Sequence, residues 1–126
     1  MSRILLVLAF VTVVAGMPNV MPAQAQAPDS TTIRAATAVL KSDLRNLVTA
    51  QESYFADTMT YAPSVQALRY RPSRGATVVV LMSSAKNHSA IATMETVPGL
   101  VCAIFVGEAS PPLGTGEEGV PVCRWP

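Results

Sequence analysis

The sequence has few of the residues from which most catalytic and metal sites are built. Among its 126 residues there are one histidine and two cysteines, and charged residues make up 13%. A lone His88 without a cluster of His or Cys neighbours offers no ligand set for zinc. The sequence also has no nucleophile elbow of the kind that serine hydrolases carry. We therefore expect no catalytic and no metal-binding residues, and a small hydrolase built around His88 is left as a third reading.

A strong excess of charge of one sign is also missing. The chain has nine basic and eight acidic residues, and Arg3 lies in a segment that we expect to be removed. A nearly neutral domain exerts no bulk attraction on nucleic acid or on anionic membranes. We therefore expect partners that are proteins, other copies of the same chain included, and no nucleic acid.

The first 25 residues are typical of a secretory signal peptide. Arg3 precedes an apolar run over residues 4–17, which is shorter than the roughly 20 residues of a membrane-spanning helix. Ala23-Gln24-Ala25 has the small residues that signal peptidase recognises, so we expect cleavage after Ala25. The expected location is periplasmic, extracellular or on the cell surface, with no stable membrane anchor after cleavage. Retention of the segment as an anchor is the alternative.

A long amphipathic helix is predicted from about residue 30 to residue 57, after a short polar linker over residues 26–32. Asp29, Ser30 and Thr31 each suit the N-cap. Apolar residues follow at steps of three and four, which is the spacing of one helix face. The residues expected in the core, from this face and the turn after it, are Leu40, Leu44, Leu47, Tyr54, Phe55 and Tyr61.

Strands are predicted after the helix. The β-branched apolar run over residues 76–82 reads as a buried strand, and residues 88–96 and 100–106 read as two more. Residues 120–123 are a candidate closing strand, confined to a sheet edge by Pro121. The order predicts an α+β fold in which one long N-terminal amphipathic helix packs on a three- to four-stranded antiparallel sheet. Residues 33–126 would form this single domain.

The two cysteines, Cys102 and Cys123, both lie in the part that we expect to be exported. Two cysteines in an exported chain most simply form a disulfide. Closing a loop of that size would stabilise the fold by roughly 3 kcal/mol. Two free buried thiols are the alternative.

Residues 41–61 read KSDLRNLVTAQESYFADTMTY, a helix that ends in Tyr54-Phe55 and is followed by a turn and Thr60-Tyr61. This stretch resembles the end of the helix in type IV pilins and in the pseudopilins of type II secretion. The strand with Cys102, the Gly- and Pro-rich loop after it and the final Cys123 are similar to the disulfide-bounded C-terminal region of that family. The resemblance implies a pilin-like head domain. Because some pseudopilins bind calcium in their C-terminal loop, it also implies calcium as a candidate ligand at Glu117 and Glu118, although no other cofactor is expected.

The N-terminal region departs from the pilin pattern. Prepilins have a Gly before their cleavage site and then a long hydrophobic stem with a Glu near its start. Here Gly16-Met17 is the nearest match, but Met21 stands in place of the Glu and the apolar run precedes the expected cut. The expected protein is a pilin-like head without its assembly helix. Polymerisation would then need contacts between heads or strand addition at a sheet edge.

Charge is unevenly distributed along the chain. One stretch has basic residues only, namely Arg69, Arg71, Arg74 and Lys86, and the next has acidic residues only, namely Glu95, Glu108, Glu117 and Glu118. If the loops that carry them lie at opposite ends of the sheet, the opposite charges would steer head-to-tail contacts. Ordinary solvated loops and an anion site at the arginines are the alternatives. The candidate interaction residues are Arg69, Arg71, Arg74, Glu108, Glu117 and Glu118.

These observations favour an exported, pilin-like structural or adhesive protein that acts through protein–protein contacts, as a filament subunit or a minor pilin-like component. The alternative is a monomeric periplasmic binding or accessory module with a pilin-like head. A concave apolar pocket with convergent polar groups would favour that alternative.

Overall fold

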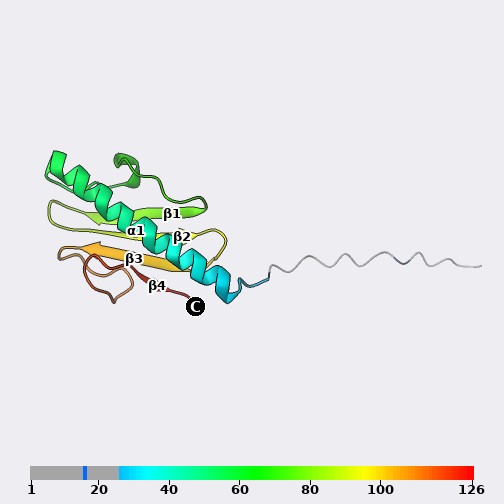
Figure 1. Cartoon of the computed structure of the whole chain (residues 1–126). Helices are drawn as coiled ribbons and strands as arrows, with labels where there is room; N and C mark the ends of the chain where they lie inside the picture. Colours follow the sequence, from blue (N-terminus) through cyan, green and yellow to red (C-terminus); the bar gives the residue numbers. More distant parts are fainter. Residues whose placement is uncertain (1–15, 17–25) are drawn as a thin grey trace, which may run out of the picture.

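One long helix lies across one face of a four-stranded sheet in the computed structural model, which describes residue 16 and residues 26–126 (Figure 1). This arrangement confirms the predicted α+β fold. The predicted signal peptide and its cleavage site fall almost entirely outside the described residues and stay a prediction. No helix in the part of the chain that the structure describes is long and apolar enough to cross a membrane.

Helix α1 spans Ser30–Thr58 and therefore begins inside the segment predicted as a linker. Of the three candidate caps, Asp29 is the one used, because its carboxylate accepts the Thr32 N–H at 2.7 Å. That hydrogen bond holds the pKa of Asp29 below its usual value. The helix ends where Met59 takes a left-handed conformation with φ of 59° and donates its N–H to the Phe55 carbonyl.

The sheet is an antiparallel meander in the order β1-β2-β3-β4. Its strands are β1 (Ala76–Ser83), β2 (His88–Met94), β3 (Val101–Val106) and β4 (Val122–Arg124). Strand β2 ends two residues earlier than predicted, because the Val97 N–H bonds to the Met94 carbonyl and begins the turn to β3. Between α1 and β1, residues 59–75 form a connector that contains the short 3₁₀ helix η1 (Val65–Ala67).

The core lies between α1 and one face of the sheet. Leu40, Leu44 and Leu47 are fully buried on the helix. The sheet places Ala90 and Ala92 opposite them, where small side chains let the helix approach closely. Burying each leucine contributes roughly 2 kcal/mol. Tyr61 is also buried, whereas Tyr54 and Phe55 are only half-buried.

Two polar side chains inside the apolar stripe of α1 fasten the connector to the helix. The Gln51 amide donates to the Ala62 carbonyl at 3.0 Å and accepts the Ala62 N–H at 2.7 Å. The buried Asp43 carboxylate accepts the N–H and the hydroxyl of Ser73 at 3.0 and 2.7 Å. These bonds satisfy polar groups that would otherwise be costly to bury. The helical pattern alone did not predict a role for either residue.

The prediction that residues 76–82 form a buried strand was wrong in one respect. Strand β1 lies at the sheet edge, and Val79 is 44% exposed, Leu81 51% and Met82 39%. The register passes from Val80 opposite Ala90 to Met82 opposite Ser89, so Leu81 is an extra residue in a β-bulge. Helix α1 covers only one face of the sheet, whereas the side chains of an apolar run point alternately to both faces. The apolar side chains of β1 that point to the other face therefore stay outside the core.

Candidate interaction surface

The second face of the sheet, which we call the outer face, points away from α1. Side chains alternate along each strand, so the cross-strand row Val79, Ile91, Ala103 and Val122 lies on this face. Only Ala103 of this row is fully buried. Part of the outer face is therefore covered and part of it is open.

The covered half lies over β3 and β4, under the loop over residues 107–121. The Gly119 N–H donates to the Phe105 carbonyl at 2.8 Å. A side chain carbon at Gly116 would lie 3.4 Å from Val122 Cγ1 and 3.8 Å from Phe105 Cε1, so the loop passes directly over these two side chains. The open half therefore belongs to β1, and its exposed apolar residues are Val79, Leu81 and Met82.

Exposed basic residues lie next to the open half of the outer face, and exposed acidic residues lie on the loop that covers the other half. Arg69, Arg71 and Arg74 lie on the connector that leads into β1, and Lys86 lies in the turn that follows β1. Glu108, Glu117 and Glu118 lie on the loop between β3 and β4. The connector and this loop are at opposite edges of the sheet (Figure 1). The three arginines are thus separated from the glutamates across the width of the sheet, whereas Lys86 lies beside Gly107 and therefore next to the acidic loop.

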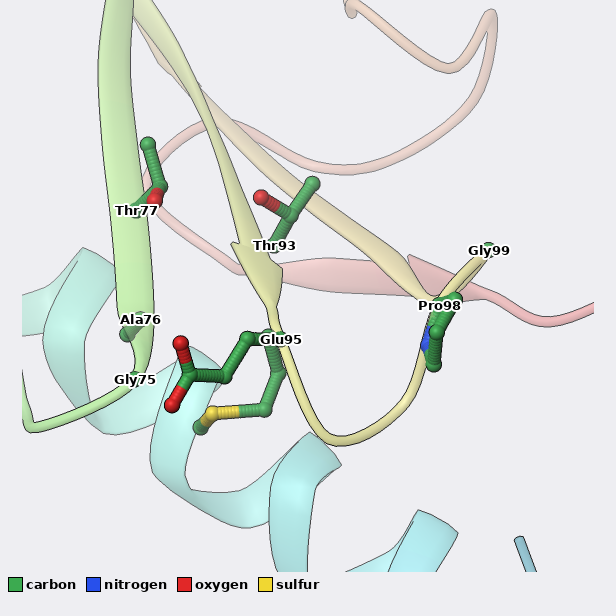
Figure 2. Close-up of a pocket in the computed structure, with 8 residues that line it drawn as sticks. Gly75, Ala76, Thr77, Thr93, Glu95, Pro98 and Gly99 are labelled. Carbon is green, nitrogen blue, oxygen red and sulfur yellow. The ribbon is translucent and has the colours of Figure 1, made fainter. Parts of the chain in front are cut away.

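Glu95 departs from this separation. It belongs to the acidic stretch of the sequence, but its N–H donates to the Gly75 carbonyl at 3.0 Å. Its carboxylate also lies close to Gly75, beside the basic connector (Figure 2). Glu95 is grouped with the other three glutamates in the sequence but does not lie with them in the structure. The β1–β2 hairpin brings residues 75 and 95 together and so places Glu95 beside the basic connector.

A hollow of about 480 Å³ lies at this end of the sheet, between the β1–β2 ladder and the turn to β3. Thr77 and Thr93 are paired across β1 and β2 at its wall, and Pro98 and Gly99 form the opposite side (Figure 2). The polar side chains that line it are two hydroxyls and the Glu95 carboxylate. The hollow is open to solvent. Because it has so few polar groups, it would hold a small molecule only weakly in any one orientation.

The acidic loop was also the predicted calcium site. Glu118 Oε1 accepts the Gly107 N–H at 2.7 Å, and Glu117 is exposed. Among the described residues there is no group of three or more His, Cys, Asp or Glu side chains placed to hold a metal ion. Calcium binding at this loop therefore stays a prediction that rests on the family resemblance alone.

His88 is fully buried at the start of β2. Its ring centroid lies 4.6 Å from that of Tyr61, and Tyr61 in turn packs on Phe55 at 4.9 Å. Neither ring nitrogen has a hydrogen-bond partner in the described part of the chain. A hydrolase triad needs a hydroxyl and a carboxylate bonded to these nitrogens, and the structure places neither there.

Burial shifts the acidity of both rings. It lowers the pKa of His88, against the smaller opposing effect of the Glu52 charge. It raises the pKa of Tyr61, whose hydroxyl donates to Glu52 Oε1 at 3.0 Å. At neutral pH the two rings are therefore neutral, and they pack as uncharged aromatic groups.

The two cysteines form the predicted disulfide, between directly opposed residues of β3 and β4.

No protein-family model matches the chain, and no curated protein matches it significantly. The class that the fold defines is an α+β domain of pilin-like architecture, with one helix on a four-stranded antiparallel sheet.

Proposed function

We propose that this chain is an exported, pilin-like structural or adhesive protein that acts through protein–protein contacts, as a filament subunit or a minor pilin-like component. We further propose that its partner is a second copy of the same chain. The observation that carries the proposal is the open half of the outer face, where Val79, Leu81 and Met82 are exposed. Exposed apolar side chains grouped on one strand are typical of an interaction site.

The position of β1 strengthens this reading. It is an eight-residue strand at the sheet edge, whereas the opposite edge strand β4 has three residues. Proteins usually protect an edge strand with charges, proline or a β-bulge. Strand β1 contains no charge and no proline, so the bulge at Leu81 is the one such feature within it. Its exposed apolar residues lie between two exposed cations, Arg74 before the strand and Lys86 after it.

A second copy offers the complementary surface. The loop between β3 and β4 carries three exposed glutamates, and Val120 beside them is 45% exposed. An apolar centre with a basic border on one side of the molecule thus matches an apolar centre with an acidic border on the other. Contacts between two different patches join copies head to tail, and such contacts extend into a fibre when the rotation does not close.

A mixing experiment tests the contact. Leu81→Asp places a charge in the open half, and Val120→Asp places one on the acidic side. Each variant alone is expected to be monomeric, because one of its two patches is spoiled. A mixture is expected to form a 1:1 complex by analytical ultracentrifugation, because one intact patch of each kind remains.

The matched control is Ala35→Asp, a change at an exposed position of α1 that is expected to leave association intact. Circular dichroism checks that every variant is folded. If Leu81→Asp abolishes association while Val120→Asp still associates alone, the contact joins β1 to β1 and the head-to-tail arrangement is wrong. A wild-type chain that never associates would remove the second copy as partner.

The alternative function is a monomeric periplasmic binding or accessory module. The hollow lined by Thr77, Thr93 and Glu95 is the observation that favours it. Thr93→Val removes a hydroxyl at little change in volume, so it is expected to weaken binding of any ligand held there and to leave self-association unchanged.

A further inference from the structure

His88 is the polar side chain whose environment the fold explains least. A neutral imidazole has one N–H donor and one nitrogen acceptor, and both are buried here without a partner. Leaving such groups unpaired destabilises the folded state. An aromatic hydrocarbon at this place would fill the same space without this cost, so a histidine here suggests that its ability to take up a proton matters.

The charged and titratable groups around His88 come from several elements. Glu52 of α1 is the carboxylate that acts on it, and Tyr61 of the connector covers its ring. Lys86 lies two residues before it in the turn, and Glu118 of the β3–β4 loop acts on Tyr61. Its strand partners, Ser83 on β1 and Val106 on β3, carry no charge.

Tyr61 is fixed at the point where the chain leaves the helix. Its N–H donates to the Ser84 carbonyl at 3.0 Å, and its neighbour Ala62 forms both hydrogen bonds to Gln51. A charge placed under the Tyr61 ring would therefore act on the junction between the connector, the helix end and the β1–β2 turn.

We propose that His88 is an acid-sensitive latch, in which protonation of the buried imidazole releases the Tyr61 segment from the sheet and exposes the aromatic rings of Tyr61 and Phe55. An imidazolium carries two N–H donors and a charge, and the closed site provides no hydrogen-bond acceptor for either N–H. Lifting of Tyr61 admits water to the ring and lets it approach Glu52.

The direction of the pH effect follows from linkage. A solvated histidine titrates near pH 6.5, and burial lowers the pKa of His88 in the closed state. Between these two values the open state binds more protons than the closed state, so acidification favours opening. The closed state is fully stable above about pH 6.5 and loses stability as the pH falls toward the lowered pKa. Each unit of difference between the two pKa values is worth about a tenfold change in the opening equilibrium.

Native-state hydrogen exchange at single amides tests the latch. On going from about pH 7.5 to about pH 5.5, the opening equilibrium constants at the Tyr61 and Ala62 amides are expected to rise by up to about tenfold after correction for intrinsic exchange, the limit set by a solvated pKa near 6.5. The Leu47 amide in the middle of α1 is expected to change little. In His88→Phe, which keeps an aromatic ring but cannot be protonated, the rise at Tyr61 and Ala62 is expected to disappear.

Three results would overturn the proposal. They are an equal rise in His88→Phe, a rise of the same size at Leu47, and a ring pKa of His88 at or above the solvated value in an NMR titration of the wild type. The NMR titration needs no variant, so the test stands even if His88→Phe fails to fold. The latch is independent of self-association, because it concerns the face of the sheet that α1 covers.

Discussion

Replacing Gly107 with alanine is expected to lower the free energy of unfolding by about 3 kcal/mol. Gly107 has a φ of +75°, in the left-handed region. A side chain there costs roughly 1 to 2 kcal/mol from backbone sterics alone. The remainder arises because the new methyl group would collide with the Lys86 carbonyl oxygen and with Asn87 Oδ1.

The collision matters because Gly107 lies where the β1–β2 turn meets the β3–β4 loop. Asn87 Oδ1 accepts the Glu108 N–H at 2.6 Å, and the Gly107 N–H itself donates to Glu118 at 2.7 Å. Moving the backbone to make room for a methyl group would break hydrogen bonds worth roughly 1 kcal/mol each. The closing of the acidic loop onto the sheet therefore depends on this glycine.

Gly114 provides a matched control. It also has a φ of +75°, but a methyl group there would meet nothing within 4 Å. Gly114→Ala is expected to cost only the steric strain of the backbone, roughly 1 to 2 kcal/mol. Urea denaturation of both variants measures the difference. Equal losses for the two variants would show that the predicted collision does not occur.

Removal of the disulfide is expected to cost a similar amount, about 3 kcal/mol. The bond joins Cys102 and Cys123 across a separation of 21 residues and so closes the whole acidic loop in the unfolded chain. Strand β4 contributes only three residues to the sheet. Without the bond, we expect β4 and the loop to detach first, because β4 is short and most residues of the loop are exposed.

The double variant Cys102→Ala with Cys123→Ala tests this expectation. Its midpoint of thermal unfolding is expected to fall well below that of the oxidised wild type, and a reductant is expected to lower the wild-type midpoint but not that of the variant. Equal midpoints for the oxidised wild type and the variant would contradict a stabilising role for the bond.

The sequence was sufficient to predict the elements that repeat a simple pattern. The three-and-four spacing from Ile33 to Val48 predicted α1, and the apolar runs predicted the strands to within a few residues. Two cysteines in a chain with a signal-like start predicted the disulfide. The helix and strand signals are local in sequence, and the disulfide was predictable because two cysteines allow only one pairing within the chain.

Other features depend on contacts that no local pattern encodes. Gln51 bonds to Ala62, which is 11 residues away, and Asp43 bonds to Ser73, which is 30 residues away. Because the partners are distant in sequence, the helical pattern could not show that these two polar side chains are buried. Burial of His88 likewise depends on where the connector places Tyr61.

The interaction surface was predictable only in part. The sequence separates the basic stretch from the acidic one, but it does not show at which edge of the sheet each stretch lies. Nor does it show that Val79 and Leu81 are left open while the loop over residues 107–121 covers the other half of the outer face. The way the layers pack decides this point, because α1 covers one face of the sheet and the loop over residues 107–121 covers only part of the other.

Light scattering on the purified, oxidised protein, over a range of concentrations and from low to high salt, is the most direct test of self-association. We expect large species that grow with concentration at low salt and become smaller as salt screens the basic and acidic patches. A monomer at every concentration and salt would contradict self-association and would favour a module that acts on a different partner.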